Sequence, residues 1–571
     1  MHSRKSADSL LARLDHQPVP LAFGTSGRRG LLRDLTQLEI FINARAELEY
    51  LKQLPVSDGG IVSGDEVFFA ADLRPSSTAR DADGRGELAQ AIETAIRVSA
   101  LVPRYMGQIP TPALTAYALS EGKASIMVTG SHIPFDRNGY KTNTSRGELM
   151  KSHEAPITAR VAELRAEVYA QLFEDALFDA SGNLKTGSGP LPSPGTAARE
   201  AYVQRYLDFF GPQLLKGFRL VVYQHSAVGR DLLPEILEGL GAEVITSGRS
   251  DTFVPIDTEN VDDACMATIQ HLLDEAMQAH GRIDALLSTD GDSDRPLVIG
   301  VDPTTGKARF FGGDLVGMVT ADFLGAEAVV VPISCNDAID RGPLKSRLRP
   351  KTRIGSPFVI EGMEAAIREG ARAVCGWEAN GGFLVGTPLT RLGRSLAPLA
   401  TRDAVLPMIA VLAAAREREM QLNDLFDTLP PRFSRAALLK NFPRAVSLSI
   451  IAALSPAALN GPEIRFLADD VVCGGAPLSQ AEKVELETIR GRLGQFFTPS
   501  QGFGRIAALN YTDGLRIYFE NGDVAHIRPS GNADELRVYA VSDTQERANA
   551  IAAFAVAEPT GILRVMEREL G

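Results

Sequence analysis

The sequence predicts an α/β protein, with three related α/β domains followed by a smaller C-terminal α+β domain. A local pattern recurs three times: a helix closed by glycine leads into a short apolar strand, at residues 126–128, 244–245 and 373–375. After residue 431 the pattern changes to alternating strands, and Asn521-Gly522 between two of them is a strong hairpin signal. At 571 residues the chain is too long for one core, and about 150 residues per domain indicates three or four domains.

Three breaks divide the chain into these domains. Residues 187–195 are too rich in proline and glycine for regular structure and separate the first domain from the second. A second break is expected near residues 311–314, before a helix that runs toward Phe323, and a third near residues 429–431. The predicted domains are therefore residues 1–195, 196–310, 311–430 and 431–571.

The composition is that of an ordinary globular protein with an acidic balance. The formal net charge of −12 argues against a general nucleic-acid binder, which would carry a basic field. An anionic ligand must instead be attracted by a local cluster of arginines and lysines.

The cysteines and apolar segments bear on the compartment. Four widely spaced cysteines without a Cys-x-x-Cys pair fit a reduced, cytoplasmic protein. The basic N-terminus is not followed by a long apolar stretch, so no secretory signal is expected. The most apolar segment, residues 404–415, is about half a membrane span and contains Pro407, so a buried helix and no membrane association are predicted.

An acidic loop is the most informative motif. Asp290, Asp292 and Asp294 alternate on a turn after a short apolar run, and carboxylate oxygens at such positions are ligands for a divalent cation such as Mg²⁺. A calcium EF-hand is excluded because Arg295 and Val301 stand where that loop needs Gly and Glu. A solvated acidic turn is the alternative.

Three more polar loops point to phosphate chemistry. Ser131 follows the apolar run of residues 124–128 and supplies a hydroxyl nucleophile. Residues 23–30 hold three glycines and two arginines, while residues 528–532, with Arg537 behind them, suit a phosphate monoester. Plain exposed turns are the alternative for both. Because ligands gather at the carboxyl ends of strands, the loops together suggest phosphoryl transfer.

These segments resemble one family, the α-D-phosphohexomutases, which include phosphomannomutase and phosphoglucomutase. The family's Thr-Ala-Ser-His-Asn-Pro…Asn-Gly-x-Lys signature is similar to residues 129–141, and its Asp-Gly-Asp-x-Asp-Arg metal loop to residues 290–295. Its Phe-Gly-Thr-Ser-Gly-x-Arg-Gly opening resembles residues 23–30, and its Arg-Pro-Ser-Gly-Thr phosphate loop residues 528–532. The order of the motifs agrees from end to end, so the resemblance spans nearly the whole chain.

Some positions depart from the family pattern. Gly130 replaces alanine and Ile133 replaces asparagine beside the nucleophile, and Asn532 stands where the phosphate loop usually has threonine. The sugar-selecting loop, usually Gly-Glu-x-Ser-Gly-His, is here residues 377–382, which keep Glu378 but change the serine and histidine positions. The loop is similar to a variant in bacterial phosphomannomutases. These changes bear on the choice of sugar and not on the chemistry.

The resemblance implies a mechanism around a central active-site cleft between domains with mixed sheets. Ser131 would be a phosphoserine that exchanges its phosphoryl group with a hexose 1- or 6-phosphate through a hexose 1,6-bisphosphate, which is also the activator. One Mg²⁺ per site would be held by the three aspartates and an oxygen on Ser131. Arg29 and Arg295 would bind the remaining phosphoryl oxygens.

The resemblance also assigns the remaining roles. Lys141, expected on a loop that returns toward Ser131, is the favoured general base, and His132 is a second candidate that more readily orients the loop. Glu378 and Asn380 would bind sugar hydroxyls, and the fourth domain would rotate to exclude water. The phosphate that does not react would be held by Arg528, Ser530, Gly531, Asn532 and Arg537.

Several alternatives remain open at this point. Within the family, the sugar could be mannose, glucose or glucosamine phosphate. From other classes come a metal-dependent sugar phosphatase, which would release inorganic phosphate, and a non-catalytic sugar-phosphate sensor. The expected partners are small hexose phosphates, and a monomer or homodimer fits the sequence equally.

Overall fold

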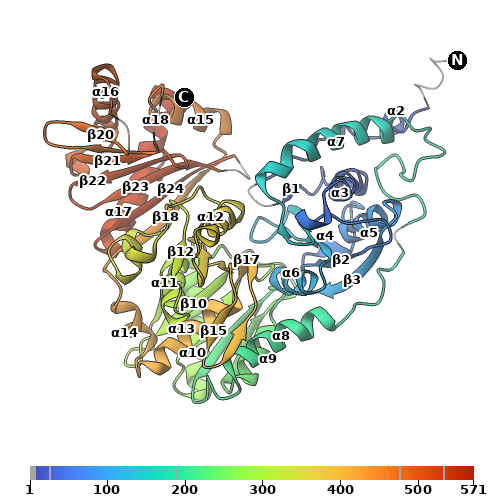
Figure 1. Ribbon diagram of the computed structural model, residues 1–571, viewed down its shortest axis with the longest axis horizontal. Helices are drawn as coiled ribbons and strands as arrows, with labels where there is room; N and C mark the ends of the chain where they lie inside the picture. The colour runs from blue at the N-terminus through green and yellow to red at the C-terminus, as the bar shows by residue number, and fades with distance from the viewer. Residues whose placement is uncertain (1–7, 25–26, 188, 459–460, 475–476, 531–533) are drawn as a thin grey trace.

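The computed structural model describes residues 8–24, 27–187, 189–458, 461–474, 477–530 and 534–571. Within these ranges the strands form five sheets, of which four are the centres of successive units that we name domains I to IV. Figure 1 shows domain I in blue and teal on the right and domain IV in orange and red at the upper left. Domains II and III lie below and between them. This architecture confirms the predicted fold class.

Domain I is built on a mixed six-stranded sheet of order β1-β5-β4-β2-β3, with β6 paired to β5. Strands β3 and β4 each pair in parallel with β2. Strand β5 pairs antiparallel with β4, and β1 pairs antiparallel with β5. Its elements are α2 (Leu10–Arg13), β1 (Arg28–Leu31), α3 (Gln37–Leu51), η1 (Val56–Asp58), β2 (Glu66–Ala71), α4 (Pro75–Thr78), α5 (Leu88–Val98), β3 (Val102–Gln108), α6 (Thr111–Ser120), β4 (Ala124–Val128), β5 (Arg137–Thr144), β6 (Gly147–Glu148) and α7 (Lys151–Tyr169).

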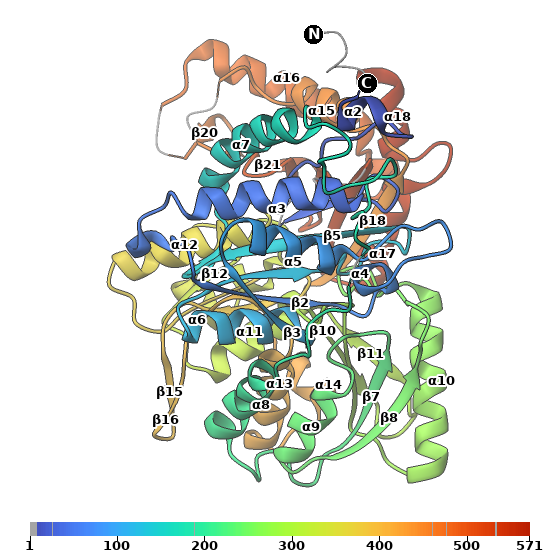
Figure 2. The ribbon, with the colours of Figure 1, turned by 90° about the vertical axis from the view of Figure 1, so that its right-hand side faces the viewer.

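Alternation along β2 explains why both faces of this sheet are covered. Val67 and Phe69 belong to one buried cluster with the apolar side of α5, whereas Phe68 and Ala70 belong to another with α6. Successive side chains of a strand point to opposite faces, so an unbroken apolar run requires a helix layer on each side. The helices lie above and below the sheet in Figure 2.

Domain II repeats the arrangement with a sheet of order β11-β10-β9-β7-β8. Strands β7, β8 and β9 are parallel, and β10 and β11 are antiparallel. Its elements are α8 (Ala197–Phe210), β7 (Arg219–His225), α9 (Leu232–Gly239), β8 (Glu243–Arg249), α10 (Asp263–His280), β9 (Ala285–Thr289), β10 (Pro296–Val301) and β11 (Ala308–Phe311).

Domain III is a reduced version, with a sheet of order β12-β13-β14-β17 and a separate hairpin of β15 and β16. Where the other two domains carry an outer parallel strand, isolated bridges such as Val329 to Leu348 take its place. The elements are α11 (Gly313–Phe323), β12 (Ala328–Val330), η2 (Asp337–Asp340), η3 (Pro343–Arg347), α12 (Ser356–Arg368), β13 (Val374–Trp377), β14 (Phe383–Val385), β15 (Leu389–Arg391), β16 (Arg394–Leu396), β17 (Leu399–Asp403), α13 (Val405–Glu417) and α14 (Leu422–Asp427).

The three domains share one strand that positions the site. Strands β4, β9 and β13 each pair in parallel with an earlier strand of their sheet, which is β2, β7 or β12 respectively, and antiparallel with the strand that follows. One of the three recurrent segments was therefore matched wrongly, because residues 244–245 lie on the outer strand β8 and the equivalent strand is β9. A glycine-ended helix precedes the outer strand as well, so that local signal does not separate the two positions.

Domain IV confirms the predicted α+β unit with an antiparallel sheet. Its seven strands have the order β18-β24-β23-β22-β21-β19-β20, and the Asn521-Gly522 hairpin joins β22 to β23. Its elements are β18 (Phe433–Lys440), α15 (Arg444–Ala453), β19 (Glu463–Phe466), β20 (Val471–Cys473), α16 (Gln480–Phe496), η4 (Pro499–Gln501), β21 (Ile506–Asn510), β22 (Leu515–Phe519), β23 (Val524–Pro529), β24 (Glu535–Ser542), α17 (Gln545–Val556) and α18 (Ile562–Leu570).

Core packing separates domain IV from the rest. One buried cluster runs continuously through domains I, II and III, with members such as Phe68, Val222 and Val385, and it includes the buried helix predicted at residues 404–415. Domain IV has a buried cluster of its own. At the junction, the buried Arg432 guanidinium binds Asp337 of domain III at 2.6 Å and Asp543 of domain IV at 2.7 Å. Domains I to III thus share a core, and domain IV is attached through these ion pairs and through a small apolar cluster of Ile333, Ile354 and Tyr539.

The four cysteines carry free thiols, which agrees with the expected absence of a disulfide frame. Among the helices in the described ranges, none has the length and apolar character needed to cross a bilayer.

Buried His526 on β23 makes the stability of domain IV dependent on pH. Its Nε2 donates to the Asp513 carbonyl at 2.6 Å, and burial together with Arg516 lowers the pKa of His526 to about 3. The pKa of a histidine in the unfolded chain is about 6.5. Below that pH and above about 3, the unfolded chain binds a proton at His526 that the folded chain does not bind. The free energy of unfolding therefore falls as the pH drops toward 3, by about 1.4 kcal/mol per pH unit. The unfolding free energy of the wild type, measured relative to His526→Gln, should shrink between pH 7 and 4.5. A constant difference would contradict this.

Candidate active site

Loops from domains I and II meet at the predicted nucleophile. Ser131 lies in the loop between β4 and β5, and the acidic residues lie in the equivalent loop between β9 and β10. The Ser131 hydroxyl donates to Asp290 Oδ2 at 2.7 Å, although the two residues are 159 positions apart. Equivalent strands of related sheets therefore bring the hydroxyl and the acidic loop into contact.

Arg74, which belongs to none of the predicted motifs, holds the Ser131 loop in a strained conformation. Ser131 is fully buried and has a φ of 53°, in the left-handed region that is unfavourable for a non-glycine residue. The Arg74 guanidinium donates to the Ser131 carbonyl at 3.1 Å and to the Pro134 carbonyl at 2.8 Å. A Cβ at Gly130 would lie 2.5 Å from Arg74 Nε, which explains why glycine replaces the family's alanine.

The three aspartates form a compact, buried cluster with room for a cation. Ligand oxygens of Asp290, Asp292 and Asp294 all lie within 4.8 Å of one another. Oδ1 of Asp292 and Oδ1 of Asp294 are buried and, within the described part of the chain, have no hydrogen-bond partner. Unpaired buried carboxylate oxygens are costly, and a hard divalent cation is the partner they would prefer. The donor set therefore fits the predicted cation site.

The surroundings of these carboxylates shift their pKa values in opposite directions. Burial and repulsion by Asp292 and Asp294 raise the pKa of Asp290 well above its usual value. Burial acts in the same direction on Asp292, but Lys141 and Thr111 overcome it and lower the pKa of Asp292. The cluster consequently keeps negative charge where cationic side chains face it.

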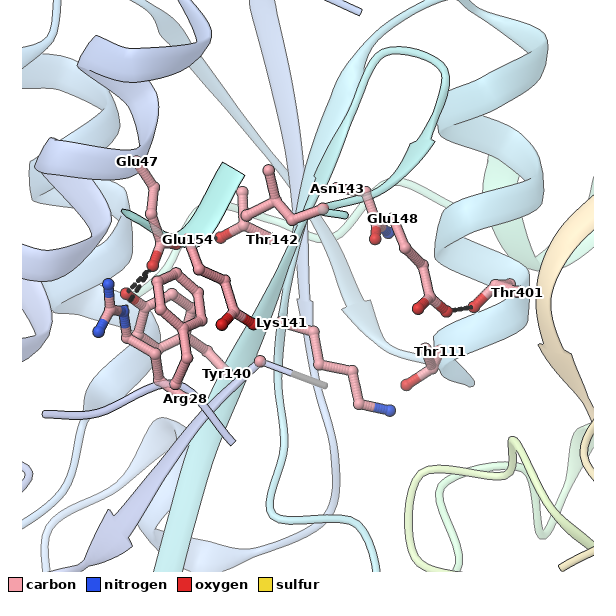
Figure 3. A pocket seen from close by; sticks show the side chains of 13 residues that line it. Arg28, Glu47, Thr111, Tyr140, Lys141, Thr142, Asn143, Glu148, Glu154 and Thr401 are labelled. Carbon is pink, nitrogen blue, oxygen red and sulfur yellow. Dashed lines mark hydrogen bonds and ion pairs between the residues drawn. The ribbon is translucent and has the colours of Figure 1, made fainter. Parts of the chain in front are cut away.

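Lys141, expected on a loop, lies on strand β5, where it is the register partner of Met127 on β4. Its Nζ is 2.8 Å from Asp292 Oδ2 and 2.8 Å from Asp294 Oδ2. In Figure 3 the amine extends away from Tyr140 of the same strand and from Glu47 of helix α3, which Tyr140 contacts. A strand gives this amine a firmer position beside the acidic cluster than a loop would.

His132 is arranged as an acceptor. Arg295 Nη1 lies 2.9 Å from His132 Nδ1, and because arginine can only donate, this nitrogen accepts. Burial and the nearby arginines lower the pKa of His132 well below its usual value, which keeps the ring neutral. Ser131 Oγ is 3.3 Å from the same nitrogen. The geometry suits orientation of the loop better than transfer of a proton.

The cleft above these loops collects side chains from all four domains. Burial and Arg295 lower the pKa of Arg29 to about 10, and within the described residues no carboxylate forms an ion pair with it. A half-buried cation that forms no ion pair within the described residues favours an anionic ligand, so the cleft is locally basic in an acidic chain. The cleft is lined by Arg29, His132, Glu259, Arg295, Ser334, Ile354, Glu378, Ala379, Asn380, Arg402, Arg528, Ser530, Arg537 and Tyr539.

The predicted sugar-selecting loop joins β13 to β14. It has the same place in domain III as the Ser131 loop has in domain I and the acidic loop in domain II. Asn380 Oδ1 accepts from the Gly382 amide at 3.0 Å and shapes the turn, while Thr258 of domain II donates to the Asn380 carbonyl at 2.9 Å. Glu378 Oε1 accepts from Arg402 at 3.1 Å. Both predicted side chains line the cleft.

The predicted phosphate loop follows β23 in domain IV. Arg528 and Arg537 are register partners on β23 and β24, so their side chains lie side by side at the cleft with Ser530. Arg537 also forms an ion pair with Glu259 of domain II at 3.4 Å. Gly531 and Asn532 lie outside the described residues.

Sequence reasoning missed several residues of the site. Arg74 clamps the Ser131 loop, Thr111 donates to Asp292 at 2.7 Å, and Arg402 binds both Asp294 and Glu378. Glu259 faces Arg537 across the cleft. None of the four belongs to a glycine-rich loop motif, and only the three-dimensional sheet arrangement brings them to the site.

Family models match the chain in four consecutive segments. The phosphoglucomutase/phosphomannomutase alpha/beta/alpha domain I model matches residues 20–167, the domain II model residues 200–303 and the domain III model residues 312–433. The C-terminal domain model of the same family matches residues 479–558.

Individual proteins support the same relationship. A phosphomannomutase of Sinorhizobium fredii is 35% identical over 94% of this chain and 98% of its own, and one of Salmonella muenchen is 34% identical over 92% and 93%. The crystal structure of a phosphoglucomutase/phosphomannomutase family protein of Burkholderia thailandensis aligns over 94% of this chain and 98% of its own, with a TM-score of 0.60 and 17% identity. The chain belongs to the phosphoglucomutase/phosphomannomutase family of α-D-phosphohexomutases and is an intramolecular phosphotransferase.

Proposed function

We propose that this enzyme interconverts hexose 6-phosphate and hexose 1-phosphate, with mannose or glucose as the sugar, through a phosphoserine at Ser131. The observation that carries the proposal is the pairing of two anion sites in one cleft. Arg29 and Arg295, which lie beside the Ser131 loop and the acidic loop, line one cleft together with Arg528 and Arg537 of domain IV. A mutase must hold one phosphate while it transfers another, whereas a simple phosphatase needs only one such site.

Mg²⁺ would be held by Asp290, Asp292 and Asp294, with an oxygen on Ser131 as a further ligand. Bound there, it would neutralise phosphoryl charge and act as a Lewis acid. The buried Oδ1 atoms of Asp292 and Asp294, which accept no hydrogen bond in the described part of the chain, support this assignment.

The reaction consists of two phosphoryl transfers, the first from Ser131 to the sugar and the second from the sugar back to Ser131. The free hydroxyl oxygen of the sugar forms a bond to phosphorus as the bond from phosphorus to Ser131 Oγ breaks, and the hydroxyl proton passes to Lys141 Nζ, which must be the neutral amine at this step in order to accept it. The product is hexose 1,6-bisphosphate. After it turns in the cleft, Ser131 Oγ takes the other phosphoryl group and Lys141 returns the proton to the sugar oxygen. Added 1,6-bisphosphate would activate the enzyme by phosphorylating free Ser131.

The remaining side chains stabilise and orient. Arg29 and Arg295 would bind the equatorial phosphoryl oxygens, where transition-state charge is spread. His132, as a neutral acceptor for Arg295, would fix the position of that guanidinium. Lys141 is preferred to His132 as the base because its amine lies among the acidic cluster, next to the nucleophile.

The non-reacting end of the substrate would be bound by domain IV. Arg528, Ser530 and Arg537 would hold its phosphate, joined by Gly531 and Asn532 of the same loop, and Glu378 and Asn380 would hold sugar hydroxyls. The joint at Arg432 would let domain IV rotate and close the cleft against water. The choice of mannose over other sugars rests on the two phosphomannomutase relatives.

A direct assay tests the proposal. Purified enzyme with Mg²⁺ and a trace of glucose 1,6-bisphosphate is incubated with mannose, glucose or glucosamine 1-phosphate, and phosphorus NMR follows the products. We expect the 6-phosphate isomers of mannose and glucose, with the phosphorus content of the sugars conserved. If glucosamine phosphate is turned over fastest, the assigned sugar is wrong. If inorganic phosphate is the only product, the proposed mutase reaction is wrong and the enzyme is a phosphatase.

A further inference from the structure

One short strand ties three domains together at the active site. On β17, Thr401 donates to Glu148 of domain I at 2.6 Å, a contact drawn in Figure 3. Asp403 accepts from Tyr202 of domain II at 2.7 Å. Between them Arg402 points to the opposite side, as alternation along a strand requires. Three consecutive residues of domain III thus reach two other domains, and the middle one reaches the catalytic loops.

Arg402 divides its guanidinium between two buried carboxylates of different loops. Its Nε and Nη2 donate to Asp294 Oδ2 at 3.0 and 2.9 Å, and its Nη1 donates to Glu378 Oε1 at 3.1 Å. All three side chains are buried, so water competes little for these bonds. Asp294 belongs to the acidic cluster and Glu378 to the sugar-selecting loop.

The contacts decide which oxygens remain available. Asp294 Oδ2 accepts from Arg402 and from Lys141, while the buried Asp294 Oδ1 accepts no hydrogen bond in the described structure and has only a longer ion-pair contact of 3.5 Å with Arg295 Nε. The carboxylate is therefore turned so that one oxygen faces the place where a cation would bind. Arg402 also takes Oε1 of Glu378, which lines the cleft, and so limits how that carboxylate can turn toward a sugar.

The sugar-selecting loop packs closely against the aliphatic part of the Arg402 side chain. A Cβ at Gly382 would lie 2.6 to 2.8 Å from Arg402 Cδ, Cγ and Cβ. Glycine at this position lets the loop backbone close onto the stem, which leaves the guanidinium little freedom. A planar fork on a fixed stem can bind two carboxylates at once, whereas a lysine ammonium in its place is a single point of charge.

We propose that Arg402 is a positioning residue that orients the cation-binding carboxylate of Asp294 and the sugar-binding carboxylate of Glu378 together. This inference rests on the proposed function of the site. Its consequence is that cation affinity and sugar-phosphate affinity depend on one side chain, although the two ligands contact loops of different domains. Residues that orient metal ligands typically change affinity or activity by about 10- to 100-fold when replaced.

Arg402→Lys in the full-length chain tests the proposal, because it keeps the charge and removes the fork. Binding of Mn²⁺ without substrate is measured by electron paramagnetic resonance, and KM for mannose 1-phosphate is measured at saturating Mg²⁺. We expect Mn²⁺ affinity to fall by about 10-fold or more and KM to rise by a similar factor. The control is Arg418→Lys, which changes an exposed ion pair with Asp322 in the same domain and should alter neither quantity.

A second variant covers the case in which Arg402→Lys fails to fold. Gly382→Ala leaves Arg402 in place but presses a methyl group against its stem, so both affinities should fall in the same direction. In the double variant of Arg402→Lys with Glu378→Gln, the effects on KM should be less than multiplicative, because both changes break one link. Wild-type Mn²⁺ affinity and KM in folded Arg402→Lys would overturn the proposal. The Mn²⁺ measurement involves no turnover, so it stands even if the mutase assay shows a phosphatase.

Discussion

Ser131→Ala is expected to abolish interconversion of hexose phosphates, with a loss of about 10⁴-fold or more in kcat, because it removes the hydroxyl that would carry the phosphoryl group. The Ser131 hydroxyl donates to Asp290 Oδ2, and the strained loop around it is fixed by Arg74. Intact-mass analysis of purified wild type should show a modification of about 80 Da, a single phosphoryl group, on the peptide that contains Ser131. The alanine variant should lack both the mass and the turnover.

A matched control separates this role from general damage. Ser120 ends helix α6 of the same domain, is exposed, and donates to the Tyr117 carbonyl at 2.7 Å. Ser120→Ala should keep wild-type turnover and the added mass. Normal turnover in Ser131→Ala would refute the assigned nucleophile, and the added mass on a different peptide would move it elsewhere.

Removal of domain IV is expected to eliminate mutase turnover and leave the rest of the chain folded. Domains I to III share one continuous core, and domain IV has a separate one, so a chain that ends at Arg432 keeps its main apolar contacts. It loses Arg528, Ser530 and Arg537, which would hold the non-reacting phosphate. A cut after Leu509 would be less clean, because it leaves part of the domain IV sheet without its partner strands.

Circular dichroism melting and peptide mass analysis of residues 1–432 would test this expectation. A cooperative melt with loss of turnover is the expected result. A companion variant in the intact chain, Arg537→Ala, should raise KM without changing the melting of domains I to III. Full turnover by the shortened chain would show that domain IV has no part in holding substrate.

Local motifs explain how much of this site is predictable from sequence. The Ser131 loop, the acidic loop, the sugar-selecting loop and the phosphate loop are each continuous segments, and each was identified from its own residues. Lys141 was recognised although its element was wrong, because the signature fixes a spacing and not a secondary structure. The structure brings these segments to one cleft, and their chemical roles remain predictions.

Residues that act across domains were beyond the reach of sequence patterns. Arg74, Arg402 and Glu259 occur in segments without glycine-rich turns, and charged residues are common in any chain. Their position follows from strand register and from contacts between sheets, which a single sequence does not contain. The same limit explains why strand β8 was matched in place of β9.

The strand β17 leaves this enzyme little tolerance for changes in chain length. Since side chains alternate, one inserted residue between Leu399 and Asp403 would exchange the two faces of the strand and send the arginine away from both carboxylates. The preceding β15–β16 hairpin has no such constraint, and Leu392 at its tip is 89% exposed. Insertions and deletions among relatives should therefore accumulate at the tip of this hairpin, between Arg391 and Arg394, and be rare in β17.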